Sequence, residues 1–128
     1  MQGKVEKIAV EIANRLTNYW IHHSRYRETV DICQKTLGLF TDYRLLHSLA
    51  RAEEVFGEVE QASKDYQQAL AICPAADKKE KSSIIHNLAI LKANAGDNPA
   101  TIALFEQSLE LKEGIDYLQY LAASKFVW

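Results

Sequence analysis

Residues 43–76 read YRLLHSLARAEEVFGEVEQASKDYQQALAICPAA, and they contain the pattern from which the fold can be predicted. Its apolar side chains recur every three or four positions on both sides of Gly57, which is the spacing of helices with one buried face. Gly57 and Pro74 interrupt the pattern, because glycine favours the turn after a helix and proline cannot continue a helix interior. The stretch therefore predicts two helices, near residues 42–56 and 59–73, joined by a tight turn.

The same apolar period runs through the rest of the chain. It predicts further helices near residues 4–22, 26–39, 79–95, 99–112 and 115–127. Gly114 is expected to end the helix at 99–112 with a left-handed cap. No stretch keeps the strict alternation of a half-buried strand. The sequence therefore predicts an all-α chain of seven helices.

The helical hairpin is repeated. The turn residues Ser24, Gly57 and Gly96 are separated by 33 and 39 residues, and the helices that follow them align without gaps. A period in the thirties with two helices and a turn indicates a helical solenoid, in which each hairpin covers the apolar face of the next. We expect one domain over residues 1–128, with repeats at about 10–42, 43–81 and 82–114 and a terminal capping helix at 115–128.

The middle hairpin resembles the tetratricopeptide repeat (TPR) family. It keeps that family's residues at Leu46, Leu49, Ala50, Gly57, Ala62, Tyr66, Ala69 and Pro74, the third hairpin keeps Ile85, Leu88, Ala89, Gly96 and Phe105, and the first keeps Leu16, Trp20 and Leu37. Glu53 and Lys92 stand where the family has an aromatic residue. The resemblance implies a right-handed alpha-alpha superhelix of antiparallel helices, a TPR-like solenoid. It also implies an adaptor that binds a protein or peptide in a concave groove.

In this family the first helix of each hairpin lines the groove, and helical spacing selects the side chains on that face. They are Asn14, Arg15, Asn18, His22, Arg44, His47, Ser48, Arg51, Glu54, Ser83, His86, Asn87, Ile90, Asn94, Gln119 and Tyr120. Asn, Arg and His side chains can hydrogen-bond a peptide backbone or carboxylate. Arg15, Arg44 and Arg51 favour an acidic or polar segment. Exposed polar residues on any helix would give the same pattern, and this alternative stays open.

One well-known TPR subtype holds the C-terminal carboxylate of a chaperone with two Lys, two Asn and one Arg. The corresponding positions here are Asn14, Asn18, Ser48, Ser83 and Asn87. Only Asn18 agrees with that set, and its three cations are missing. Capture of an Hsp70 or Hsp90 tail through this clamp is therefore not expected.

Charge and motifs restrict the remaining function classes. Lys plus Arg number 15 against 17 Asp plus Glu, so the net charge of −2 provides no basic field for nucleic acid. No apolar run reaches the ~20 residues of a membrane span, and the N-terminus has no signal-peptide core. The sequence has neither a glycine-rich phosphate loop nor a His-Glu-x-x-His pattern. We expect a cytoplasmic, non-enzymatic protein with no cofactor, metal or catalytic residue.

Two further features keep alternatives open. His47 and His86 occupy equivalent places in their hairpins, and they are either groove-lining residues or a metal-binding or pH-sensing pair. The last helix carries aromatic residues on the face that should be polar in a cap, at Tyr117, Tyr120, Phe126 and Trp128. The chain is then either part of a longer array or a module that forms a homodimer through this helix. A loose likeness to TPR arrays on signalling ATPases adds a sensor segment as a third possibility.

Overall fold

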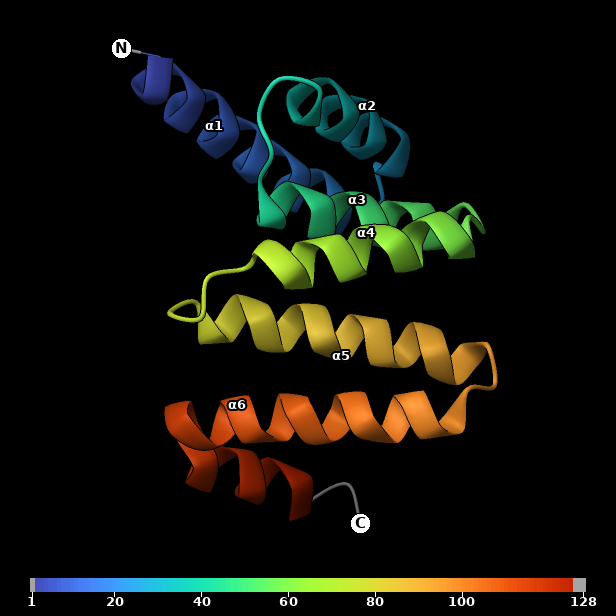
Figure 1. Cartoon of the computed structure of the whole chain (residues 1–128). Helices are drawn as coiled ribbons and strands as arrows, with labels where there is room; N and C mark the ends of the chain where they lie inside the picture. Colours follow the sequence, from blue (N-terminus) through green and yellow to red (C-terminus); the bar gives the residue numbers. More distant parts are fainter. Residues whose placement is uncertain (1, 126–128) are drawn as a thin grey trace. The chain divides into compact units, whose positions relative to one another are not determined.

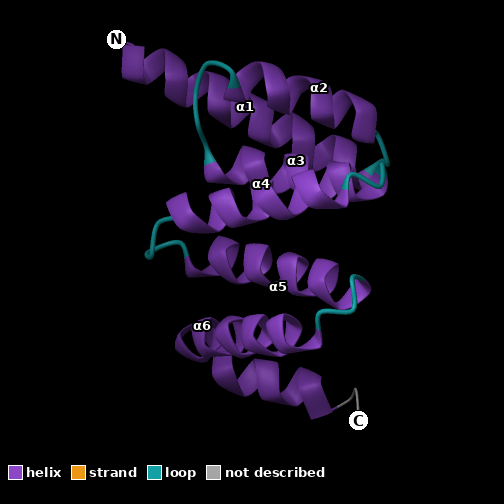
Figure 2. Cartoon of the chain, turned by 45° about the vertical axis from the view of Figure 1, so that its right-hand side comes forward, coloured by secondary structure: helices purple, strands orange, loops and turns teal. Residues whose placement is uncertain are grey.

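The computed structural model describes the backbone of residues 2–125 and the side chains of residues 3–111. Residues 2–125 form six helices: α1 (Gln2–His22), α2 (Tyr26–Leu37), α3 (Tyr43–Val55), α4 (Val59–Ile72), α5 (Lys78–Asn94) and α6 (Asn98–Lys125) (Figure 1). The backbone described here contains helices and loops but no strand, which confirms the all-α prediction (Figure 2). Within this part of the chain, no helix is both long and apolar enough to cross a membrane.

The prediction of seven helices was wrong by one, because α6 continues through Gly114 to Lys125. Glycine in a helix interior costs only about 1 kcal/mol relative to alanine, so it does not by itself end a helix. Its neighbours Lys112 and Glu113 are good helix formers, and no proline follows. As far as residue 125, the separate helix expected at 115–127 is therefore the second half of α6.

The three aligned turn residues share one unusual backbone conformation. Ser24, Gly57 and Gly96 have φ values of 58°, 80° and 83°, in the left-handed region. In each turn the following N–H donates to the carbonyl five residues earlier, a helix-ending arrangement of the Schellman type. These bonds are Arg25 to Trp20 (2.7 Å), Glu58 to Glu53 (2.9 Å) and Asp97 to Lys92 (2.9 Å). The first helices of the three hairpins therefore end in the same way.

The chain divides into two compact units, Met1–Ile72 and Cys73–Trp128. In the first unit, α1 packs against α2 and α3, and α3 packs against α4. A core cluster joins Val10 and Ala13 of α1, Cys33 of α2, and Leu45 and Leu49 of α3. The first two hairpins thus share one apolar core.

Small residues allow close approach within the α3–α4 hairpin. Ala50 of α3 and Ala62 and Ala69 of α4 are completely buried. In the second unit α5 packs against α6, and the hydroxyl groups of Ser82 and Ser108 form a buried hydrogen bond of 3.0 Å between these helices.

Ser24→Gly is expected to raise the free energy of unfolding by about 1 kcal/mol, because glycine removes the cost of a side chain at positive φ. Chemical denaturation of the full chain measures the change. Ser24→Ala is the control, since it keeps the Cβ atom. Equal stability of the two variants would contradict the strain at this turn.

Ala50→Leu is expected to lower the free energy of unfolding by about 1–3 kcal/mol, because the extra carbons have no space in the α3–α4 hairpin. Ala71→Leu is the matched control, because Ala71 is exposed on α4. A melting temperature of the Ala50 variant equal to that of the control would show that the helices do not meet closely there.

Candidate functional site

The predicted groove residues of α1 lie at its surface. Arg15, Asn18 and His22 are exposed and Asn14 is half-buried. Their spacing of one, three and four residues places them on one side of the helix. The first helix therefore presents a polar row of amide, guanidinium and imidazole groups.

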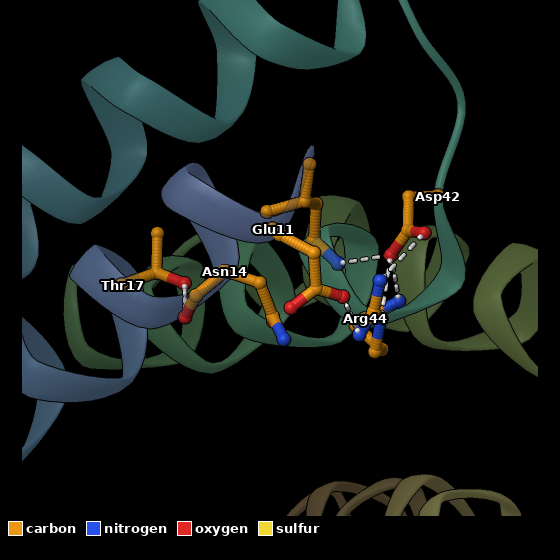
Figure 3. A network of polar contacts seen from close by, with 6 residues as sticks. Glu11, Asn14, Thr17, Asp42 and Arg44 are labelled. Carbon is orange, nitrogen blue, oxygen red and sulfur yellow. Dashed lines mark hydrogen bonds and ion pairs between the residues drawn. The ribbon is translucent and has the colours of Figure 1, made fainter. Parts of the chain in front are cut away.

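Arg44, at the start of α3, has a structural role in the first unit. Its Nη1 donates to Glu11 Oε1 of α1 at 2.8 Å, and its Nε donates to Asp42 Oδ1 at 3.3 Å. Asp42 also caps α3, because its Oδ1 accepts from the backbone N–H groups of Arg44 at 2.8 Å and Leu45 at 3.3 Å. Figure 3 shows this network joining α1 to the beginning of α3.

This network changes the expected role of Arg44. The hydrogen bond and the positive charge of Arg44 lower the pKa of Glu11. Two carboxylates already share the guanidinium, so it does not add an uncompensated cation to the polar face. Of the three arginines that were predicted to make this region cationic, Arg15 and Arg51 are exposed and belong to no ion pair among the described side chains.

The middle of α3 is less accessible than the sequence suggested. His47 and Ser48 are buried rather than groove-exposed, while Arg51 is exposed and Glu54 is half-buried. The His47 ring lies 5.8 Å from the ring of Tyr66 on α4. A polar residue at a groove position of the repeat is therefore not always accessible to a ligand.

In the second unit the predicted residues belong to α5. Ser83, His86, Ile90 and Asn94 are exposed, and Asn87 is half-buried. The other predicted residues, Gln119, Tyr120, Tyr117, Phe126 and Trp128, lie outside the described side chains.

The two hairpins repeat one aromatic contact. The His86 ring lies 5.6 Å from the ring of Phe105 on α6, as His47 lies against Tyr66. Each histidine thus packs on the aromatic residue of its own hairpin, which accounts for its position without a ligand. A shared role for His47 and His86 stays a prediction. Among the described side chains, no group of three or more His, Cys, Asp or Glu could hold a metal ion.

A buried pair of acids in the α3–α4 hairpin was missed at the sequence level. Glu53 and Asp65 are 3% and 7% exposed, and Glu53 Oε1 and Asp65 Oδ2 have no hydrogen-bond partner. The other oxygen of Asp65, Oδ1, accepts from Gln61 Nε2 at 3.1 Å. Glu53 occupies the aromatic position of the TPR pattern, which faces the interior, and this departure from the pattern was the available signal.

The environment of Glu53 keeps it protonated. Burial and the nearby carboxylates of Asp65 and Glu58 raise the pKa of Glu53 well above its usual range. A proton on Glu53 removes the cost of burying its negative charge. Burial also raises the pKa of Cys33 to about 12, so this thiol is unreactive.

Glu53→Gln is expected to flatten the dependence of stability on pH. Native Glu53 holds a proton that the unfolded chain loses above the ordinary carboxyl pKa, so stability falls as pH rises. From about pH 5 to pH 8 the fall reaches about 1.4 kcal/mol per pH unit for one proton. Denaturation curves of wild type and variant should therefore diverge with rising pH. Glu106→Gln, at an exposed position, is the control and should follow wild type; parallel curves for all three would contradict the buried proton.

Comparison with known proteins rests on structure, because no protein-family model and no curated protein sequence matches the chain. The type III secretion translocator chaperone SycD of Yersinia enterocolitica matches with a TM-score of 0.73 and 14% identity, over 89% of this chain and 83% of that chain. PcrH, solved in complex with the chaperone binding region of PopB, matches with a TM-score of 0.72 and 18% identity, over 89% of each chain.

The TPR2AB domain of yeast Sti1, solved as a complex with pHSP90, matches with a TM-score of 0.70 and 22% identity. The match covers 93% of this chain but only 46% of that one, so this chain spans about half of the Sti1 segment. Identities of this size show the fold alone. The chain therefore has the fold of TPR-like helical-repeat proteins, as its sequence pattern predicted.

Proposed function

We propose that the chain is a non-enzymatic protein-binding module that holds an extended acidic or polar peptide segment along the polar faces of α1 and α3. The observation that carries this proposal is that Arg15 and Asn18 of α1 and Arg51 of α3 stay exposed in a unit whose helices are otherwise packed together. We also propose the exposed polar row of α5, in the second unit, as a further binding face.

The chemistry of these side chains suits a peptide with carboxylates. A guanidinium group donates two parallel hydrogen bonds to one carboxylate, and an asparagine amide can both donate to and accept from a peptide backbone. Arg44 is already neutralised by Glu11 and Asp42, so the charge available to a ligand comes from Arg15 and Arg51. We therefore expect a moderately acidic internal segment rather than a C-terminal tail held by a carboxylate clamp.

The structurally similar proteins support a binding role for this kind of fold. PcrH is described with a region of PopB bound to it, and the Sti1 domain is described in a complex with pHSP90. In both structures a protein of similar fold is bound to another protein or to a part of one. The choice of partner by this chain depends on its own exposed residues.

Arg51→Glu is expected to weaken binding of an acidic peptide about tenfold at low salt, which corresponds to roughly 1.4 kcal/mol. The probe is a fluorescent peptide of alternating Glu and Ser, measured by anisotropy, with a Gln-for-Glu version as the uncharged reference. The difference between variant and wild type should shrink at high salt, because ions screen exposed charges.

Arg27→Glu is the matched control, because Arg27 is an exposed arginine on a second helix, α2. It changes the net charge by the same amount as Arg51→Glu but leaves α1 and α3 unchanged. Equal losses in the two variants would indicate attraction by net charge alone. Equal affinity for the acidic and uncharged peptides would contradict the proposed preference.

A further inference from the structure

The outer side of α1 carries a row of exposed apolar side chains. The exposed fractions of Val5, Ile8, Ile12, Leu16 and Tyr19 lie between 37% for Leu16 and 62% for Val5. Their spacings of three, four, four and three residues keep them on one face of the helix. A continuous apolar face of this length on a surface helix indicates an interaction site.

The repeat identifies which face this is. In the next repeat, 33 residues later, the positions of Ile12, Leu16 and Tyr19 are occupied by Leu45, Leu49 and Ala52 of α3. Leu45, Leu49 and Ala52 are buried. Leu45 and Leu49 belong to the core cluster that includes residues of α1 and α2. In α3, therefore, this face is the one covered by the preceding hairpin.

In α1 the same face has no hairpin over it among the described residues. A solenoid hairpin is stable because its neighbours cover its apolar face, so an uncovered stacking face favours association. The remaining question is what covers it. Two features of α1 indicate what covers this face: the spacing of its apolar residues and the distribution of its charged residues.

We propose that a second copy of the chain covers this face, through an antiparallel pairing of the two α1 helices about a two-fold axis at Ile12. The spacing of three, four, four and three reads the same in both directions. An antiparallel copy therefore aligns Val5 with Tyr19, Ile8 with Leu16 and Ile12 with itself. This is the self-complementary pattern that a two-fold interface requires.

The charges of α1 favour the same direction. The charged residues of the first half are Lys4, Glu6, Lys7 and Glu11, whereas the one charged residue among positions 13–21 is Arg15. An antiparallel pair places the charged half of one helix beside the nearly uncharged half of the other. A parallel pair would instead place the two charged halves beside each other.

The size of the contact sets the expected affinity. The paired residues extend from Val5 to Tyr19, a rise of about 21 Å along the helix. We estimate roughly 1,000 Å² of total buried surface, at the lower end of specific interfaces, so the dimer should dissociate in the micromolar range. It should therefore be measured over a range of concentrations from about 1 to 200 µM.

Sedimentation equilibrium of the full chain tests the proposal. Wild type should be dimeric at the highest concentration, and Ile12→Glu should be monomeric throughout. Ile102→Glu is the matched control, because Ile102 is 59% exposed on α6 and Ile12 is 56% exposed on α1. This control should dimerise like wild type, and circular dichroism melts should show that both variants fold.

Cysteine crosslinking tests the register without disturbing charge. Under mild oxidation, Ile12→Cys should crosslink to itself, and Val5→Cys should crosslink to Tyr19→Cys when the two proteins are mixed. Val5→Cys alone should remain uncrosslinked, since its two copies would lie about 21 Å apart along the helix. The native Cys33 and Cys73 are buried, so wild type treated in the same way serves as the blank.

Several results would overturn the proposal. They are a monomer at every concentration, a dimer unaffected by Ile12→Glu, or self-crosslinking of Val5→Cys. A dimer that Tyr120→Glu dissociates and Ile12→Glu does not would place self-association on the C-terminal helix instead. Arg51→Glu should leave the dimer intact, so failure of peptide binding and failure of dimer formation are separate results.

Discussion

The structure depends on the burial of apolar surface between successive hairpins. Two antiparallel helices cannot hide all of their apolar side chains from water by packing on each other alone. In the first unit this need is met by the cluster of Val10, Ala13, Cys33, Leu45 and Leu49, to which three helices contribute. In the same unit, Arg15 and Asn18 of α1 and Arg51 of α3 remain exposed, where the proposed peptide site lies.

Local signals in the sequence predicted most of this fold. The left-handed turns at Ser24, Gly57 and Gly96 follow from turn residues that recur after 33 and 39 residues, and the helix faces follow from apolar periods. Gly114 misled the prediction, because glycine is tolerated inside a helix whose other residues favour it. A single glycine marks a helix end only when the neighbouring residues agree.

The candidate site was harder to predict, because accessibility depends on partners far away in the sequence. The sequence predicts Arg44 to be a free cation, but in the structure Arg44 is hydrogen-bonded to Glu11, 33 residues earlier. His47 reads as a groove residue until Tyr66 of the next helix is placed beside it. Glu53 stands at the aromatic position of the repeat, and only the structure shows that Asp65 of the next helix is buried with it. Helical spacing gives the direction of a side chain, whereas its charge and exposure depend on tertiary contacts.

The φ of 58° at Ser24 affects the order in which the helices of the first unit unfold. The first hairpin has a strained turn where the next two hairpins have glycine, and the outer side of its α1 is uncovered. In repeat proteins, stability is close to a sum over units and their junctions, so loss of structure starts at the weakest end. Unfolding of the first unit should therefore begin at α1 and proceed toward α4. A partner bound to α1 would stabilise that end against unfolding.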